Sequence, residues 1–221
     1  MTASLAQRLG AEALGSLFLL AGVVGSGIMG ETLSPENDAV ALLGNTIATG
    51  AVLVVLVTIL GPLSGAHLNP AVSLVMMLRG ELTTRQLLAY VPSQILGGCL
   101  GTLAAHLMFD IPVFQLASTL RTGPGQWFAE FVAAFGLLLT ILGCARFKPD
   151  AVAMGVGLYI TAAYWFTAST SFANPAVTIA RALSDTFAGI SPAHVPAFVA
   201  AQIAGALVGA ACWRWLSRGA T

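Results

Sequence analysis

The sequence predicts an all-α integral membrane protein with six transmembrane helices and two re-entrant half-helices in an inverted repeat. Of its 221 residues, 57% are hydrophobic and 8% are charged, which is about a third of the charge of an average soluble domain. Long charge-free runs divide the chain, and two of them contain the tripeptide Asn-Pro-Ala. Nine basic residues against nine acidic ones leave no basic stripe, which excludes a nucleic-acid binder.

The charge-free runs define the predicted spans. A membrane helix needs about 20 mostly apolar residues, and four segments each fit one helix: 13–30, 86–109, 126–145 and 186–213. The runs 39–78 and 151–180 are longer. Each holds one span, the first ending near Leu60 at a Gly61-Pro62 break, and a leftover too short to cross. The first run lacks a clear cleavage site, so we expect a retained span and not a signal peptide.

The basic residues predict the orientation. Six crossings put both termini on one side, where seven basic residues then lie: Arg8, Arg79, Arg85, Arg146, Lys148, Arg214 and Arg218. Arg121 and Arg181 lie on the other side. Since short cytoplasmic loops carry an excess of Lys and Arg, both termini are predicted to be cytoplasmic.

Matching motifs divide the chain into two halves. Glu12 corresponds to Glu130 and Gln94 to Gln202, with one Asn-Pro-Ala between the members of each half. Each half therefore contains three spans and one partial span, and three crossings give the halves opposite topology. Inverted repeats with interrupted helices place a pathway at the membrane midplane. We expect one channel domain, 1–221, with repeats of about 1–110 and 120–221.

Each Asn-Pro is predicted to start a helix. Asn is a favoured N-cap, and Pro suits the first helical position. Pro70 to Arg79 gives a helix of about 15 Å at 1.5 Å per residue, half of the roughly 30 Å hydrocarbon core, and Gly80 fits its end. The second half-helix is expected from Pro175 to about Ser184. The two signatures are Asn69-Pro70-Ala71 and Asn174-Pro175-Ala176.

The segments before the two Asn residues are predicted to line a pore. Their unpaired carbonyls are tolerated only beside a wet cavity, and they belong to Gly65, Ala66, His67, Leu68, Ser171, Phe172 and Ala173. With each Asn oxygen capping a helix, its amide N–H groups face a permeant molecule. Two positive helix ends at the centre disfavour cations. Such a pore suits small neutral hydroxylated solutes.

On these motifs the chain resembles the aquaporin, or major intrinsic protein, family. The segment 64–72 and the second Asn-Pro-Ala are similar to its signature loops, and Glu12 and Glu130 to its buried glutamates. The resemblance implies a right-handed bundle, a homotetramer in the lipid bilayer with one pore per subunit, and neither cofactor nor metal. It implies that Glu12 and Glu130 are structural and hold the backbone of the signature loops.

The chain departs from the family pattern at the outer filter. The residue after the second Asn-Pro-Ala, usually Arg, is Val177, and the helix-2 position, usually Phe or Trp, is Thr49. The resemblance assigns Ser171 and Tyr164 to the other two positions. We therefore expect a wider, uncharged and partly hydroxyl-lined filter that passes water, glycerol-like polyols and arsenite or methylated arsenicals. This pattern is similar to bacterial aquaglyceroporin-like channels associated with arsenic resistance, which implies a bacterial inner membrane.

Other functions remain open at this stage. A strict water channel is one, and an ion-coupled transporter using Glu12, Glu130 or His67 as a mid-membrane titratable group is another. His67 would by analogy face the cytoplasmic half of the pore and could gate it. No enzyme is expected, because no nucleophile–base pair or metal cluster is recognisable. The apolar surroundings of the three cysteines, Cys99, Cys144 and Cys212, indicate packing rather than disulfides or zinc.

Arg181 has two interpretations. It follows Val177 by one helical turn, so it lies about 6 Å nearer the outside on the same face. It would supply a displaced positive charge in the outer vestibule, or it would pair with Asp185 at spacing i,i+4.

Overall fold

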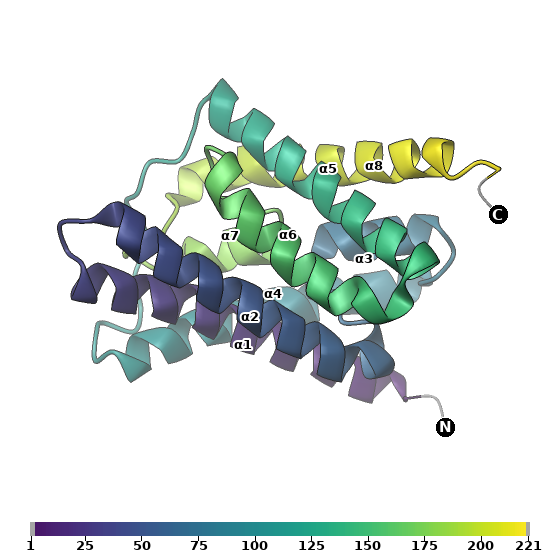
Figure 1. Ribbon diagram of the computed structural model, residues 1–221. Helices are drawn as coiled ribbons and strands as arrows, with labels where there is room; N and C mark the ends of the chain where they lie inside the picture. Colours follow the sequence, from purple (N-terminus) through teal and green to yellow (C-terminus); the bar gives the residue numbers. More distant parts are fainter. Residues whose placement is uncertain (1–2, 220–221) are drawn as a thin grey trace.

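The computed structural model of the protein describes residues 3–219, and in that range it contains helices and no strands (Figure 1). The elements are α1 (Leu5–Leu33), α2 (Asp38–Ser64), α3 (Pro70–Leu78), α4 (Thr84–Met108), α5 (Pro124–Phe147), η1 (Pro149–Ala151), α6 (Val152–Phe166), α7 (Pro175–Arg181), η2 (Pro192–His194) and α8 (Val195–Leu216). This confirms the predicted fold class of long spanning helices and two short half-helices.

Five segments are long and apolar enough to cross a membrane: Leu5–Leu33, Asp38–Ser64, Thr84–Met108, Pro124–Phe147 and Pro192–Leu216. The sixth predicted crossing is α6, which has 15 residues and follows η1 directly. Both termini lie at one end of the bundle; α3 lies toward that end and α7 toward the other (Figure 1). An even number of crossings returns the chain to the end at which it began, and opposite topology of the two halves places the half-helices at opposite ends.

Local sequence explains most helix starts. Ser4 and Thr83 form capping boxes with Gln7 and Gln86, so both orphan donors at each start are satisfied. Asn37 caps α2 by accepting from the backbone N–H of Val40.

Two helix ends differ from the prediction. The Gly61-Pro62 break is wrong, because α2 continues to Ser64 and ends at Gly65 with φ +89°. Pro62 lies in the last helical turn, where the loss of one backbone hydrogen bond interrupts little. The second half-helix ends at Arg181 and not at Ser184, since the next residues form tighter i→i+3 hydrogen bonds, such as Ser184 N–H to Arg181 O at 3.3 Å.

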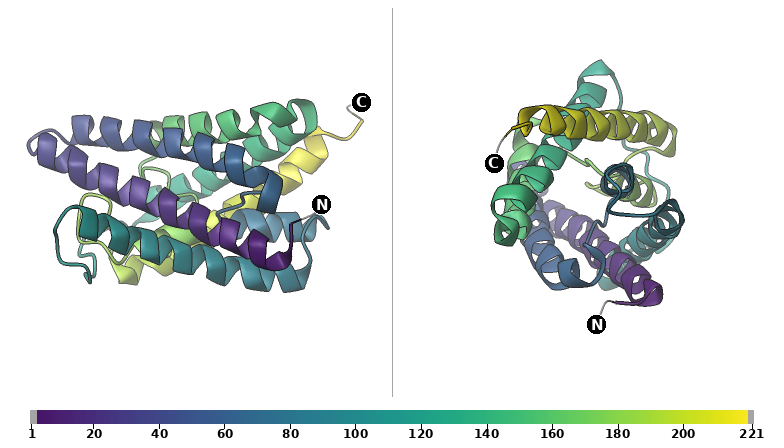
Figure 2. Two further views of the ribbon diagram at one scale, coloured as in Figure 1. Left: turned by 90° about the horizontal axis from the view of Figure 1, so that it is seen from below. Right: turned by 90° about the vertical axis from the view of Figure 1, so that its right-hand side faces the viewer.

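The same helix pairs form in each half. In the first half α1 packs along α4, and in the second α5 packs along α8, while α2 packs along α6 between the halves. Glycines allow the close approach: a Cβ on Gly101 would lie 2.1 Å from the carbonyl oxygen of Leu17, and one on Gly205 would lie 2.2 Å from that of Phe131. Viewed along the bundle, the long helices form a ring (Figure 2).

Leucine, valine, isoleucine and phenylalanine side chains cover the outside of this ring. Exposed examples are Phe18, Ile47, Val55, Leu96, Phe128 and Leu158. The three cysteines are half-buried free thiols. An exterior of exposed apolar side chains suits a lipid solvent and would be unfavourable in water.

Candidate functional site

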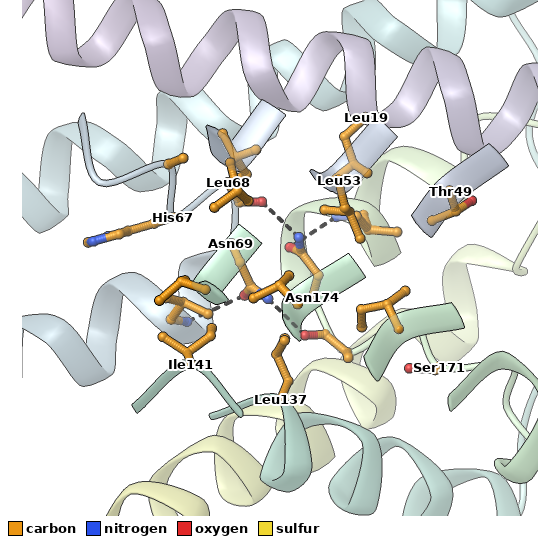
Figure 3. Close-up of a pocket in the computed structure, with 18 of the residues that line it drawn as sticks. Leu19, Thr49, Leu53, His67, Leu68, Asn69, Leu137, Ile141, Ser171 and Asn174 are labelled. Carbon is orange, nitrogen blue, oxygen red and sulfur yellow. Dashed lines mark hydrogen bonds between the residues drawn. The ribbon is translucent and has the colours of Figure 1, made fainter. Parts of the chain in front are cut away.

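The two Asn-Pro helix starts meet at the centre of the bundle. Asn69 Oδ1 and Asn174 Oδ1 each accept the backbone N–H two residues further on, at 2.9 Å, and so cap α3 and α7. Each side-chain amide also reaches the opposite loop: Asn69 Nδ2 donates to Ala173 O at 2.8 Å, and Asn174 Nδ2 donates to Leu68 O at 2.7 Å (Figure 3). The two loops are thus joined reciprocally.

This reciprocal pairing corrects one expectation. One N–H of each Asn amide is committed to the other loop, so one, and not both, remains for a solute. Likewise the carbonyl oxygens of Leu68 and Ala173 each accept one hydrogen bond from an Asn side chain. One of the two lone pairs on each oxygen therefore remains for a solute. The reason is that the two loops meet at hydrogen-bonding distance, which neither loop's own sequence reveals.

Both loops use an unusual backbone conformation. Ala66 and Leu68 have φ of +45° and +49°, and Ser171 and Ala173 have +50° and +49°. A non-glycine residue in the left-handed region costs roughly 1–2 kcal/mol, and such residues gather at functional sites. The sequence does not predict this conformation. Glycine is the residue that usually adopts a positive φ, and Gly65 is the only glycine in the two loops.

Glu12 holds the first loop. Its carboxyl group is fully buried. Oε1 accepts from the backbone N–H of His67 at 3.0 Å and from Ser64 Oγ at 2.6 Å. Oε2 accepts from the backbone N–H of Leu68 at 2.7 Å and from Gln94 Nε2 at 2.7 Å. The backbone N–H groups of this loop have no partner within a helix, and the carboxyl group of Glu12 supplies the acceptor that they need.

Glu130 makes the corresponding set of contacts in the second loop. Its two oxygens accept from the backbone N–H groups of Phe172 and Ala173, both at 2.9 Å. Gln202 Nε2 donates to Oε2 at 2.6 Å and to Thr178 Oγ1 at 2.8 Å. In the first half, Gln94 likewise donates to Ser73 Oγ, at 2.9 Å. Sequence reasoning used Gln94 and Gln202 only as repeat markers and missed this positioning role.

A cavity of about 260 Å³ runs past both Asn residues. Side chains of α1, α2, α5 and α6 form its apolar wall, and the two loops form the other. The lining includes every residue predicted for the pore backbone and the filter: Gly65, Ala66, His67, Leu68, Phe172, Ala173, Thr49, Tyr164, Ser171 and Val177. His67 lies on one side of the Asn pair, and Thr49 and Ser171 lie on the other (Figure 3).

The end of the cavity near Thr49 has polar groups and no charge. Tyr164 donates to Thr49 Oγ1 at 3.3 Å, and the hydroxyl of Ser171 is buried without a hydrogen-bond partner in the described part of the chain. Val177 also lines the cavity and adds no polar group. At the other end the lining includes Glu81, and His67 Nδ1 lies 3.0 Å from Ser73 Oγ.

Arg181 does not pair with Asp185, so that interpretation is wrong. Asp185 is exposed and accepts from the backbone N–H and Oγ of Ser118, both at 2.8 Å. Arg181 is 2% exposed, and its Nε donates to Ala188 O in the loop that follows α7. Its guanidinium stacks on Phe172, 3.4 Å from the ring centroid. Arg181 does not line the central cavity, and no contact in the described part of the chain supports the vestibule interpretation.

Comparisons with known proteins agree with this geometry. A family model described as Major intrinsic protein matches residues 1–152 and 143–220. Aquaglyceroporin AqpS of Rhizobium meliloti (strain 1021) is 60% identical over 212 residues, which cover 96% of this chain and 91% of the relative. Aquaporin NIP1-1 of Zea mays is 31% identical, covering 95% of this chain and 73% of the relative.

The fold matches a solved structure as well. The X-ray structure of the aquaglyceroporin from Plasmodium falciparum aligns with a TM-score of 0.78 at 22% identity, covering 95% of this chain and 96% of that one. At this identity the match concerns the fold alone. The matching family model, the similar relatives and the paired Asn-Pro loops lead to one conclusion: this chain is a membrane channel and a member of the major intrinsic protein family.

Proposed function

We propose that the channel passively conducts small neutral hydroxylated solutes larger than water, as well as water. Glycerol-like polyols and arsenite or methylated arsenicals are the proposed solutes. The observation that carries this proposal is that Thr49, Tyr164, Ser171 and Val177 all line the cavity and carry no charge. We propose that these four residues form the selectivity filter, a ring at one end of the cavity. A relative with 60% identity that is named an aquaglyceroporin supports the polyol part.

The chemistry of the ring favours such solutes. Three of its four side chains carry hydroxyl groups. The Ser171 Oγ is buried without a partner in the described part of the chain, and it must turn toward the cavity to donate to or accept from a solute. A solute with several hydroxyls replaces its lost water contacts there and at the remaining amide N–H groups of Asn69 and Asn174. The apolar wall opposite suits the carbon or arsenic centre of the solute. A charged solute would lose its hydration without compensation.

The ring also favours a wider passage than an arginine at position 177 would leave. Valine ends at its γ-methyl groups, whereas an arginine at the same α7 position would extend its guanidinium across the cavity. Size selection against glycerol is therefore weak, and a strict water channel is the less favoured alternative.

A proton-coupled transporter is also less favoured. Such a transporter needs mid-membrane titratable groups that exchange protons with the pathway, and of the three candidates only His67 lines the cavity. Both carboxyl oxygens of Glu12 and of Glu130 accept hydrogen bonds from backbone and amide donors behind the loops. Neither residue lines the cavity.

We further propose a homotetramer in a bacterial inner membrane, with both termini in the cytoplasm and repeats of about 1–110 and 120–221. The excess of basic residues at the end that carries both termini supports this orientation. The equivalent helix pairs α1·α4 and α5·α8 support the repeat.

The test is stopped-flow light scattering on reconstituted vesicles with water, glycerol, urea and arsenite. We compare the wild type with Val177→Arg and, as the matched control, Val177→Thr. The arginine variant should lose glycerol, urea and arsenite flux at least about tenfold, equivalent to about 1.4 kcal/mol, and water flux much less. The threonine variant should resemble the wild type. Equal loss of all solutes, or no change, would refute the filter assignment.

A further inference from the structure

Two arginines lie directly behind the wall of the proposed filter. Phe172 follows Ser171 and lines the cavity, and its ring is in contact with guanidinium groups from two different segments. The Arg181 guanidinium carbon is 3.4 Å from the ring centroid, and that of Arg121, from the loop between α4 and α5, is 5.4 Å from it. Phe198 of α8 supports the same ring edge-on, with centroids 5.3 Å apart.

Neither guanidinium has a carboxylate partner. In residues 3–219 no Asp or Glu oxygen lies within 4.0 Å of Arg121 or Arg181. Arg121 donates to the backbone carbonyls of Gly189, at 2.8 Å, and Phe187, at 3.2 Å. Arg181 donates to Ala188 O, and its Nη1 is buried without a partner. Carbonyl oxygens satisfy the donors but do not cancel the positive charges.

The other charged groups nearby only partly offset the two arginines. Glu130 lies behind the same loop, and its carboxyl group accepts from the backbone N–H of Phe172. Glu31, Asp38 and Asp185 lie around the outer cavity of about 950 Å³, which Arg121 also lines. The shell around Phe172 thus holds two cations and one carboxyl group, while the acidic residues lie further out.

We propose that Arg121 and Arg181 form the cation barrier of this channel and act through the pore wall at Phe172. The proposal rests on the proposed function, since it takes the ring of Thr49, Tyr164, Ser171 and Val177 as the filter. Charges in a poorly screened, low-dielectric surrounding act over several ångströms, so an ion in the ring experiences them without contact. Because neither side chain enters the ring, the channel excludes cations without narrowing the passage for polyols.

The experiment measures the permeability of proteoliposomes to Na⁺, K⁺ and Cl⁻ alongside glycerol flux. The variants are Arg121→Gln, Arg121→Lys, Arg181→Gln and Arg181→Lys. The matched control is Arg85→Gln, which removes one exposed positive charge from the first turn of α4. Each glutamine variant should raise cation permeability relative to Cl⁻ about tenfold, which corresponds to about 1.4 kcal/mol. The lysine variants and Arg85→Gln should keep the wild-type ratio.

Three results would overturn the proposal. One is an unchanged cation-to-anion ratio in the glutamine variants. Another is an equal rise for cations and Cl⁻, which indicates a loosened loop. The third is identical behaviour of the lysine and glutamine variants, which indicates a packing role. If Arg181→Gln does not fold, the comparison of Arg121→Gln with Arg121→Lys still decides, because Arg121 is half-buried and not fully buried. Failure of glycerol flux alone would refute the proposed function and leave the ion ratio as a valid test.

Discussion

Replacement of Glu12 by alanine should strongly destabilise the channel, because it leaves buried backbone donors of the first pore loop without an acceptor. The substitution removes the acceptor for four donors at once: the backbone N–H groups of His67 and Leu68, Ser64 Oγ and Gln94 Nε2. Ser64 can rotate and Gln94 keeps its bond to Ser73, but the two backbone donors cannot move. A buried unsatisfied donor costs about 1–3 kcal/mol, so the backbone donors alone cost roughly 2–6 kcal/mol, a large part of the typical 5–15 kcal/mol.

The measurement is the thermal unfolding midpoint of purified channel in detergent, followed by intrinsic fluorescence, with glycerol flux in vesicles. A 1 kcal/mol loss shifts the midpoint of a chain of this size by about 2–4 °C, so we expect Glu12→Ala to unfold about 10 °C lower. Glu12→Gln keeps one acceptor oxygen and should fall between alanine and wild type.

Glu130→Ala should match Glu12→Ala, because Glu130 also accepts two backbone N–H groups and one glutamine amide. Thr58→Ala is the control, since its hydroxyl only donates within its own helix, to Val54 O at 2.6 Å. An alanine variant of either glutamate that unfolds within about 2 °C of wild type, below the shift for 1 kcal/mol, would refute the reasoning.

Two further predictions concern packing and pH. Gly101→Ala should lower the unfolding midpoint, because its Cβ would lie 2.1 Å from Leu17 O; Gly44→Ala, with no atom within 4 Å, should raise it slightly through better helix propensity. Equal midpoints would contradict the close approach. Hydrogen bonds from the backbone N–H and hydroxyl of Ser118 hold the pKa of Asp185 below its usual range. Its contribution to stability should therefore be present at neutral pH and be lost as pH falls through that lowered pKa, so wild type and Asp185→Ala should differ at pH 7 and converge in strong acid.

The local features of this channel could be predicted from the sequence. Hydropathy and charge determine where the chain enters and leaves lipid, because no lipid-exposed segment tolerates unpaired backbone groups. Asn-Pro determines where α3 and α7 begin, because cap and first-turn preferences depend on adjacent residues. Thr49 and Val177, where the chain differs from the family pattern, could also be found from the sequence. Each lies at a fixed number of residues from an Asn-Pro-Ala.

The partners of each side chain were decided by the tertiary structure alone. Arg181 has Asp185 at helical spacing, yet α7 ends at Arg181 and its guanidinium turns to Phe172 and Ala188. The Asn amides bind each other's loops, which are more than 100 residues apart in the chain. The sequence used Arg121 only to predict the orientation, whereas its guanidinium lies 5.4 Å from the ring centroid of Phe172. Residues adjacent in the chain determine where helices start and which segments span the membrane. Hydrogen bonds between distant segments, and the groups that surround a buried charge, form only when the helices pack together.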